Sequence, residues 1–262
     1  VAAFSNMWNY GGWFPNGTMG FILSFQMVVF AFTGIELVGL TAGETENPEK
    51  VIPMAINNIP LRIILFYIGS LAIIMSIYPW TAVNPAASPF VAVFTAVGIT
   101  AAAGIVNFVV LTSAASATNS GIFSTGRMIY ALAKRGHAPK SMRHLTHSSV
   151  PYQATIFSAA VLLTTVVLNY VMPEAVFVMI TSISTFCFIF IWAIMVICHL
   201  KYRKTTPELA AKSKFKMPLY PVMNYVILAF FAFILLILAL NEDTRVALFF
   251  TPVWFIILWA FY

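Results

Sequence analysis

The stretch FAFTGIELVGLTAGETENPEK, residues 30–50, places a carboxylate, Glu36, inside a pattern otherwise typical of a membrane helix. The residues from Met19 to Val29 before it are mostly apolar and bulky. Thr33 and Gly34 are poor helix formers, so we expect the helix to break between Phe30 and Ile35. Broken backbone at membrane depth is tolerated only where it lines a cavity or is buried in protein. Many secondary transporters bind charged groups at such breaks.

The composition predicts an integral membrane protein. Of the 262 residues, 61% are hydrophobic and 8% are charged, against about 25% charged in a soluble domain. A bilayer core needs roughly 20 apolar residues per helix. We therefore predict an all-α, polytopic membrane helical bundle in a single membrane domain. The expected spans are about 19–43, 60–80, 101–132, 152–172, 175–199, 219–240 and 246–262.

Prolines and short apolar runs suggest where these segments end. The segment 89–98 lies between Pro89 and Gly98, and we interpret it as a short interfacial helix before the third span. Proline does least harm at a helix end. The prolines that we take as end markers are Pro60, Pro79, Pro151, Pro173 and Pro218.

Basic residues predict the orientation. The 14 basic and 8 acidic residues give a net charge of +6, and the bases gather in the loops 134–143 and 201–216. By the positive-inside rule these loops are cytoplasmic, so the first span runs inward. The positive charge is therefore a topology signal, and we expect no nucleic-acid partner. Aromatic residues that fit an interfacial belt on the outer side are Trp8, Tyr10, Trp13, Tyr78 and Trp80.

Nothing in the sequence indicates catalysis. No phosphate-binding loop, paired-cysteine motif or HExxH motif occurs, and the histidines fall in or beside cytoplasmic loops. An intramembrane enzyme would need a catalytic pair within the spans, whereas Glu36 is the single acid there. We expect no enzymatic activity, no cofactor and no metal. A channel or a passive membrane scaffold remains an alternative to a transporter.

Two features of the spans admit structural as well as functional interpretations. A carboxylate inside a span usually marks a pathway or a binding site, but Glu36 can also pair with a base as a fold staple or lie among cytoplasmic headgroups. In the third span, LTSAASATNSGIFSTGRM (111–128) places Ser113, Ala117, Gly121 and Thr125 on one face. Close helix packing through small residues explains much of this pattern. Asn119 stands out because a buried amide needs partners.

Several stretches resemble the amino acid permeases of the amino acid–polyamine–organocation superfamily. They are the opening stretch, AINNIPLRIILFY (55–67) and NFVVLTSAASATNSGIFSTGRMIYALAKRGHAPK (107–140). Within that superfamily the likeness is strongest to bacterial D-serine/D-alanine/glycine permeases, supported by GGWFPNG (11–17), FKMPLY (215–220) and DTRVALFFTPVWFI (243–256). The likeness runs over essentially the whole chain.

The resemblance implies the fold and the partners. It implies a twelve-helix transporter with a LeuT-like inverted repeat, in which our seven spans are helices six to twelve. The chain begins at Val1 without an initiator methionine, and we expect it to be the C-terminal portion of a longer protein. Its partners are then the amino acid substrate, the lipid bilayer and helices one to five, which normally supply half of the substrate site. We expect a multi-pass location in the cell (inner) membrane.

The resemblance also implies the site residues. Phe30 would be an aromatic gate, with Ala31, Phe32, Thr33 and Gly34 lining the amino acid and Glu36 acting as a gate and coupling acid. On the third span, Asn119, Ser120 and Gly121 would face the same cavity. The implied function is proton-coupled import of small neutral amino acids, including D-isomers. The alternative is an aromatic or other amino acid permease of the same family.

Overall fold

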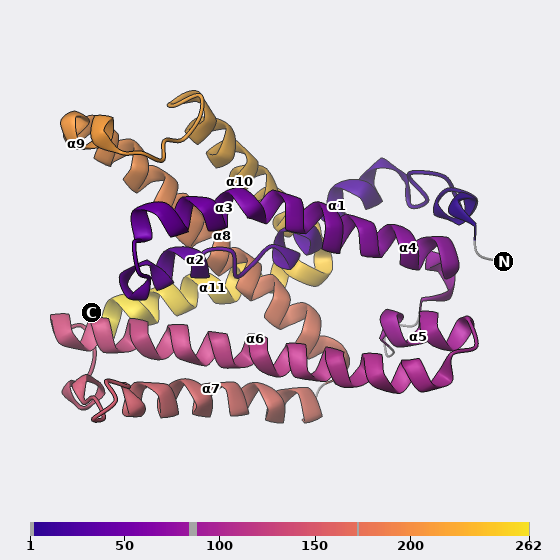
Figure 1. Cartoon of the computed structure of the whole chain (residues 1–262), viewed down its shortest axis with the longest axis horizontal. Helices are drawn as coiled ribbons and strands as arrows, with labels where there is room; N and C mark the ends of the chain where they lie inside the picture. The colour runs from indigo at the N-terminus through magenta and orange to yellow at the C-terminus, as the bar shows by residue number, and fades with distance from the viewer. Residues whose placement is uncertain (1–2, 84–87, 172, 262) are drawn as a thin grey trace. The chain divides into compact units, whose positions relative to one another are not determined.

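The chain is all-helical in the computed structural model, which describes residues 3–83, 88–171 and 173–261. The α-helices, in chain order, are α1 Gly17–Ala31, α2 Leu37–Leu40, α3 Pro48–Ile63, α4 Gly69–Ile77, α5 Pro89–Ala96, α6 Thr100–Arg135, α7 Tyr152–Val171, α8 Pro173–Thr205, α9 Pro207–Lys212, α10 Val222–Leu240 and α11 Glu242–Phe261 (Figure 1). Short 3-10 helices and one π turn connect them: η1 Phe4–Met7, η2 Thr41–Glu44, η3 Ile64–Ile68 (π), η4 Trp80–Ala82 and η5 Lys140–Arg143.

Within the described residues, five helices are long and apolar enough to cross a membrane. They cover Pro48–Ile77, Ala103–Arg135, Tyr152–Val171, Met179–Thr205 and Val222–Leu240, and two shorter apolar helices cover Gly17–Ala31 and Thr251–Ala260. The predicted all-α membrane fold class is therefore confirmed. The boundaries of the seven spans stay predictions, and the predicted ends at 172 and 262 lie outside the described residues.

Two helices show how local sequence sets their ends. The helix α6 stops at Gly136, whose φ of 91° is in the left-handed region that glycine adopts without strain. The amide of His137 then closes the end by donating to the carbonyl of Leu132 at 3.0 Å. The helix α5 begins with Pro89, where a missing amide hydrogen costs little. The expected short helix at 89–98 is thus present.

The interpretation of Pro60 as a segment end was wrong. The helix α3 begins at Pro48, continues through Pro60 to Ile63, and passes through the π turn η3 into α4. A proline inside a helix removes one hydrogen bond and creates a local clash, at a cost of about 3 kcal/mol, but it need not end the helix. The helical segment that contains Pro60 therefore covers 48–77, and the predicted span 60–80 stays a prediction.

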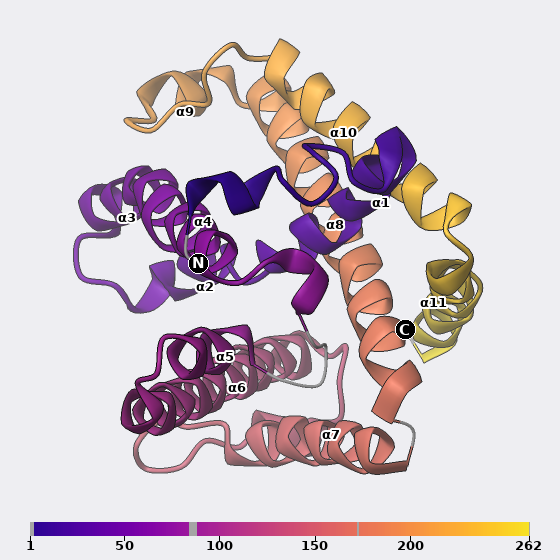
Figure 2. The same ribbon diagram turned by 90° about the vertical axis from the view of Figure 1, so that its right-hand side faces the viewer.

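The contacts divide the chain into two compact units. Unit 1 comprises Val1–Gly17 and Met54–Leu163, and unit 2 comprises Thr18–Pro53 and Thr164–Tyr262. In unit 1, η1 packs on α4 and α5 packs on α6. The first half of α7 lies beside α6 (Figures 1 and 2), where Gly126 meets Thr155. Two hydrogen bonds also connect the N-terminal segment to α4. Asn6 Nδ2 donates to the Ser76 carbonyl at 2.8 Å, and the amide of Ala3 donates to the same carbonyl at 2.9 Å.

In unit 2 the helices α1, α8, α10 and α11 form the apolar core. Its buried centre consists of Val29 from α1, Ile189 from α8, and Ile234 and Ile237 from α10. The ring of Phe25 makes edge-to-face contacts with Phe21, Phe230 and Phe233, an arrangement that adds to the burial energy of each ring. The core therefore holds α1 in place on the N-terminal side of the predicted break.

Candidate functional site

The predicted break in the first helical segment is present. The helix α1 ends at Ala31, α2 begins at Leu37, and a turn joins them. Gly34 in this turn has φ of 101°, a backbone conformation that side chains with a Cβ rarely adopt. The last amides of the helix bond three residues back: Phe32 N–H donates to the Val29 carbonyl and Thr33 N–H to the Phe30 carbonyl, at 3.1 and 3.0 Å.

Backbone groups become available at the break. Among the described residues, the structure records no hydrogen bond from the amides of Ile35 and Glu36 or to the carbonyl of Thr33. The Thr33 hydroxyl donates to the Phe30 carbonyl at 2.8 Å and so satisfies one of the carbonyls of the last helical turn. Two donors and one acceptor thus lie within four consecutive residues, 33–36. That set can bind a carboxylate through the amides and an ammonium group through the carbonyl.

Glu36 turns its carboxylate back onto the break. Gly34 N–H donates to Glu36 Oε2 at 3.1 Å, and the Glu36 side chain is half-buried. Within the part of the chain that the structure describes, Glu36 has no basic ion-pair partner. The carboxylate therefore accepts a hydrogen bond from an amide of its own turn. Among the described residues, no basic side chain pairs with it to stabilise the fold.

The other predicted residues of this segment lie around the break. The rings of Phe30 and Phe32 are half-buried, Thr33 and Gly34 are half-buried, and Ala31 is exposed. Phe30 is the residue directly after Val29, which belongs to the buried core. The packing of Val29 therefore fixes the position of the Phe30 backbone. The structure thus places Phe30, Phe32 and the freed backbone groups in one short segment.

A buried polar residue that the sequence interpretation overlooked lies one turn before Phe30. Gln26 is 5% exposed, and its Nε2 donates to the hydroxyl of Ser182 on α8 at 3.1 Å. Ser182 is fully buried, as is Thr185 on the next turn of α8. The signal that could have found Gln26 was the same one that drew attention to Asn119: a buried amide needs partners.

The predicted residues of the third span lie on the continuous helix α6 in unit 1. Asn119 and Gly121 are exposed, and Ser120 is half-buried with its hydroxyl donating to the Ser116 carbonyl at 3.0 Å. The break belongs to unit 2. A cavity shared between these residues and the break therefore stays a prediction.

Close packing on α6 uses a different glycine from the expected one. A Cβ at Gly126 would lie 2.9 Å from Thr155 Oγ1, whereas one at Gly121 would meet nothing within 4 Å. Arg127, the residue after Gly126, lies over the ring of Phe123, with its guanidinium carbon 5.1 Å from the ring centroid. Gly126 is the position where α6 and α7 approach each other most closely among the glycines of this helix.

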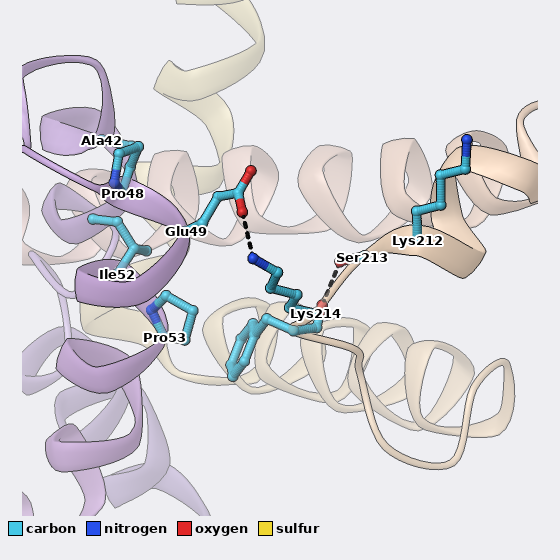
Figure 3. Close-up of a pocket in the computed structure, with 9 residues that line it drawn as sticks. Ala42, Pro48, Glu49, Ile52, Pro53, Lys212, Ser213 and Lys214 are labelled. Carbon is cyan, nitrogen blue, oxygen red and sulfur yellow. Dashed lines mark hydrogen bonds and ion pairs between the residues drawn. The ribbon is translucent and has the colours of Figure 1, made fainter.

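A pocket of about 450 Å³ lies elsewhere in unit 2, where η2 and the start of α3 meet the segment before α10 (Figure 3). Glu49 and Lys214 face each other across it with Oε2 and Nζ 2.9 Å apart. None of the predicted site residues lines this pocket. Among the described residues, no group of three histidine, cysteine, aspartate or glutamate side chains can hold a metal ion.

Known proteins resemble this chain over its whole length. The profile of the amino acid permease family matches residues 1–262. Two relatives from Bacillus subtilis (strain 168) are 69% and 66% identical over 262 and 261 residues: the uncharacterized transporter YdgF and the amino-acid permease AapA. The D-serine/D-alanine/glycine transporter of Escherichia coli (strain K12) is 52% identical over 265 residues. No solved structure matches.

These alignments cover 100%, 100% and 99% of this chain but 57%, 56% and 56% of the three relatives. The chain therefore spans slightly more than half the length of the curated relatives it matches. The chain resembles the D-serine/D-alanine/glycine transporter, but the two relatives from Bacillus subtilis are more similar to it.

Proposed function

The chain belongs to the amino acid permease family, and we propose that the complete protein imports small neutral amino acids, namely glycine, alanine and serine with their D-isomers, by proton symport. The family consists of transporters of the cell membrane, not enzymes, and the long apolar helices make this a multi-pass membrane protein. The substrate, the coupling ion and the site are the proposal.

One observation carries it: the helix interruption between Ala31 and Leu37. The amides of Ile35 and Glu36 can donate to the carboxylate of an amino acid, and the Thr33 carbonyl can accept from its ammonium group. All α-amino acids share these two groups, so backbone recognition supports binding of the class. Placing such groups at a broken helix avoids a charged protein side chain for each end of the zwitterion.

Glu36 couples the proton in this proposal. Its carboxylate accepts a hydrogen bond from Gly34 N–H at 3.1 Å, and a bond to an ionised acceptor is roughly twice as strong as a neutral one. Protonation of Glu36 weakens this internal cap and frees the Gly34 amide for the substrate carboxylate. Proton binding and substrate binding then favour each other.

The preference for small side chains rests on Phe30 and Phe32. Both rings are half-buried beside the freed backbone, where they limit the room for a substrate side chain. An apolar pocket distinguishes one methylene by only about 1–3 kcal/mol, so the backbone contacts carry most of the affinity. Asn119, Ser120 and Gly121 on α6 remain predicted substrate contacts in this proposal.

The relatives support the class more strongly than the substrate. The relative named for D-serine, D-alanine and glycine is 52% identical, and the relative named as an amino-acid permease is 66% identical. An aromatic or other amino acid permease is the alternative within the family. No residue described above selects D- over L-isomers.

Competition for transport tests the proposal. Proteoliposomes with the complete protein take up labelled glycine or alanine, and unlabelled amino acids are added in excess. We expect alanine and serine to compete well and phenylalanine and lysine to compete weakly, the first because of its size and the second because of its charge. Equal competition by phenylalanine would favour an aromatic amino acid permease. Failure of D-alanine and D-serine to compete would remove the D-isomers alone.

Counterflow distinguishes a carrier from a channel or a scaffold. Proteoliposomes are preloaded with unlabelled alanine and then exposed to a trace of labelled alanine outside. A carrier exchanges the two and concentrates the label transiently, whereas a channel only equilibrates it and a scaffold moves neither. Absence of counterflow in the complete, correctly inserted protein would refute the transporter.

A further inference from the structure

We propose that the segment 201–222, which comprises the end of α8, the helix α9 and the connection to the start of α10, forms a docking surface for anionic phospholipid headgroups. Six basic residues and one acid, Glu208, lie between positions 201 and 216. The bases are Lys201, Arg203, Lys204, Lys212, Lys214 and Lys216. Basic clusters next to the cytoplasmic end of a membrane helix attract anionic lipids.

The position of this segment brings its charges to the level of the headgroups. The apolar helices Met179–Thr205 and Val222–Leu240 flank it on both sides, and each is long enough to cross a membrane. The helix α9 and the segment after it lie at the end of the pair α8 and α10 (Figures 1 and 2). The lysines therefore stand where two apolar helices leave the hydrocarbon and meet phosphate.

The lysines are accessible. Lys212, Lys214 and Lys216 are exposed. Lys214 forms an ion pair with Glu49, but the two side chains are 77% and 78% exposed, so water screens the pair and it contributes little to stability. In Figure 3, the side chain of Lys212 extends away from this pair. A lipid phosphate can therefore reach these ammonium groups without unfolding any part of the segment.

Apolar side chains alternate with these charges. Leu209, Phe215 and Leu219 are 59%, 45% and 72% exposed. At a membrane interface such side chains enter the acyl boundary while neighbouring lysines reach the phosphates. A nucleic acid or a polar polyanion would match the charge but would leave Leu219 and its neighbours in water. An anionic bilayer surface satisfies both features.

Lipid retention by the complete protein tests this surface. The protein is purified in a non-ionic detergent and offered equal amounts of phosphatidylglycerol and phosphatidylcholine, and the bound lipids are counted by native mass spectrometry. The wild type should prefer phosphatidylglycerol. Replacing Lys212, Lys214 and Lys216 by glutamine should reduce this preference by about fivefold per lysine at low salt. The matched control replaces Lys134, Arg135 and Lys140 by glutamine and should lose less of the preference, because the loop 134–143 carries four bases against six in 201–216.

Each outcome decides the proposal. An equal loss of the phosphatidylglycerol preference in both triple variants would show that overall positive charge, and not this segment, attracts the lipid. That result would overturn the proposal, and so would no loss in either variant. Binding of RNA or polyglutamate that is lost in the first variant, without a lipid preference in the wild type, would replace the lipid by a soluble acidic partner. Added salt must also reduce the phosphatidylglycerol preference of the wild type steeply, and a preference that salt leaves unchanged would overturn the proposal.

Discussion

Replacing Glu36 by glutamine in the complete protein should separate substrate exchange from proton-driven accumulation. The wild-type carboxylate accepts from Gly34 N–H at 3.1 Å, and the glutamine side chain keeps an oxygen at the same reach. Glutamine cannot release or bind a proton in the working pH range. We therefore expect a variant that still exchanges amino acid across the membrane but no longer uses a pH difference.

The expected magnitudes follow from this one contact. A hydrogen bond to a charged group contributes about 1.5–3 kcal/mol and a neutral one about 0.5–1.5 kcal/mol, so the substitution weakens the cap by roughly 1 kcal/mol. That corresponds to roughly a fivefold change in the capped population, and the exchange rate should change by no more than about this factor. One proton moving down a one-unit pH difference supplies about 1.4 kcal/mol and drives about tenfold accumulation. The variant should accumulate nothing.

The assay uses proteoliposomes with one pH unit across the membrane. Accumulation of labelled alanine is measured with the gradient, and counterflow is measured without it. Glu46→Gln is the matched control, since Glu46 is an exposed acid ten residues further along the chain, and it should behave as the wild type does. Tenfold accumulation by Glu36→Gln would refute the coupling role. Loss of the variant from the membrane would instead reveal a buried base as its partner, whose isolation costs about 3–5 kcal/mol.

Three further sets of substitutions test the backbone of the break and the packing within each unit, with unfolding in detergent as the measurement. Gly34→Ala should reduce the free energy of unfolding by roughly 1–2 kcal/mol and reduce uptake, because alanine resists the φ of 101° at this position. A Cβ at Gly34 would meet nothing within 4 Å, so any loss would come from backbone strain and not from a clash. An unchanged stability would disprove the strain. Gln26→Leu and Ser182→Ala should each reduce the free energy of unfolding by about 1–3 kcal/mol, because each leaves a buried polar partner without its hydrogen bond. The double variant should lose much less than the sum of the two. Additive losses would show that their hydrogen bond is unimportant. Gly126→Ala should cost about 1–3 kcal/mol by overpacking against α7, while Gly121→Ala should be neutral or slightly stabilising, and equal effects would contradict the assigned contact face.

The break in the first segment could be predicted because its cause is local. Thr33 and Gly34 disfavour the helix through their own backbone and side-chain preferences, and a glycine is needed for the positive φ that the turn adopts at Gly34. The membrane fold class followed from composition for a similar reason, since apolar runs of sufficient length have few other uses.

The contacts that position the break could not be predicted because they are distant in sequence. Gln26 and Ser182 are 156 residues apart, and only the packing of α1 on α8 brings them together. The contact face of α6 was ambiguous for another reason: small residues occur on more than one face of this helix, so periodicity did not distinguish Gly126 from Gly121. Proline position was also a poor guide, since the backbone of α3 tolerates Pro60 inside the helix.

The two sides of the break differ in how firmly they are held. Before it, α1 contributes Val29 to the core of unit 2 and Gln26 to a buried hydrogen bond. After it, α2 is four residues long and contains no buried residue. Segments with few buried contacts open at lower free energy than the core, so a movement at the break displaces α2 rather than α1. The hydrogen bond between Gly34 and Glu36 lies within the turn that joins these two parts. A change in the charge of Glu36 therefore acts at the one place where the firmly packed and the weakly packed halves of the segment meet.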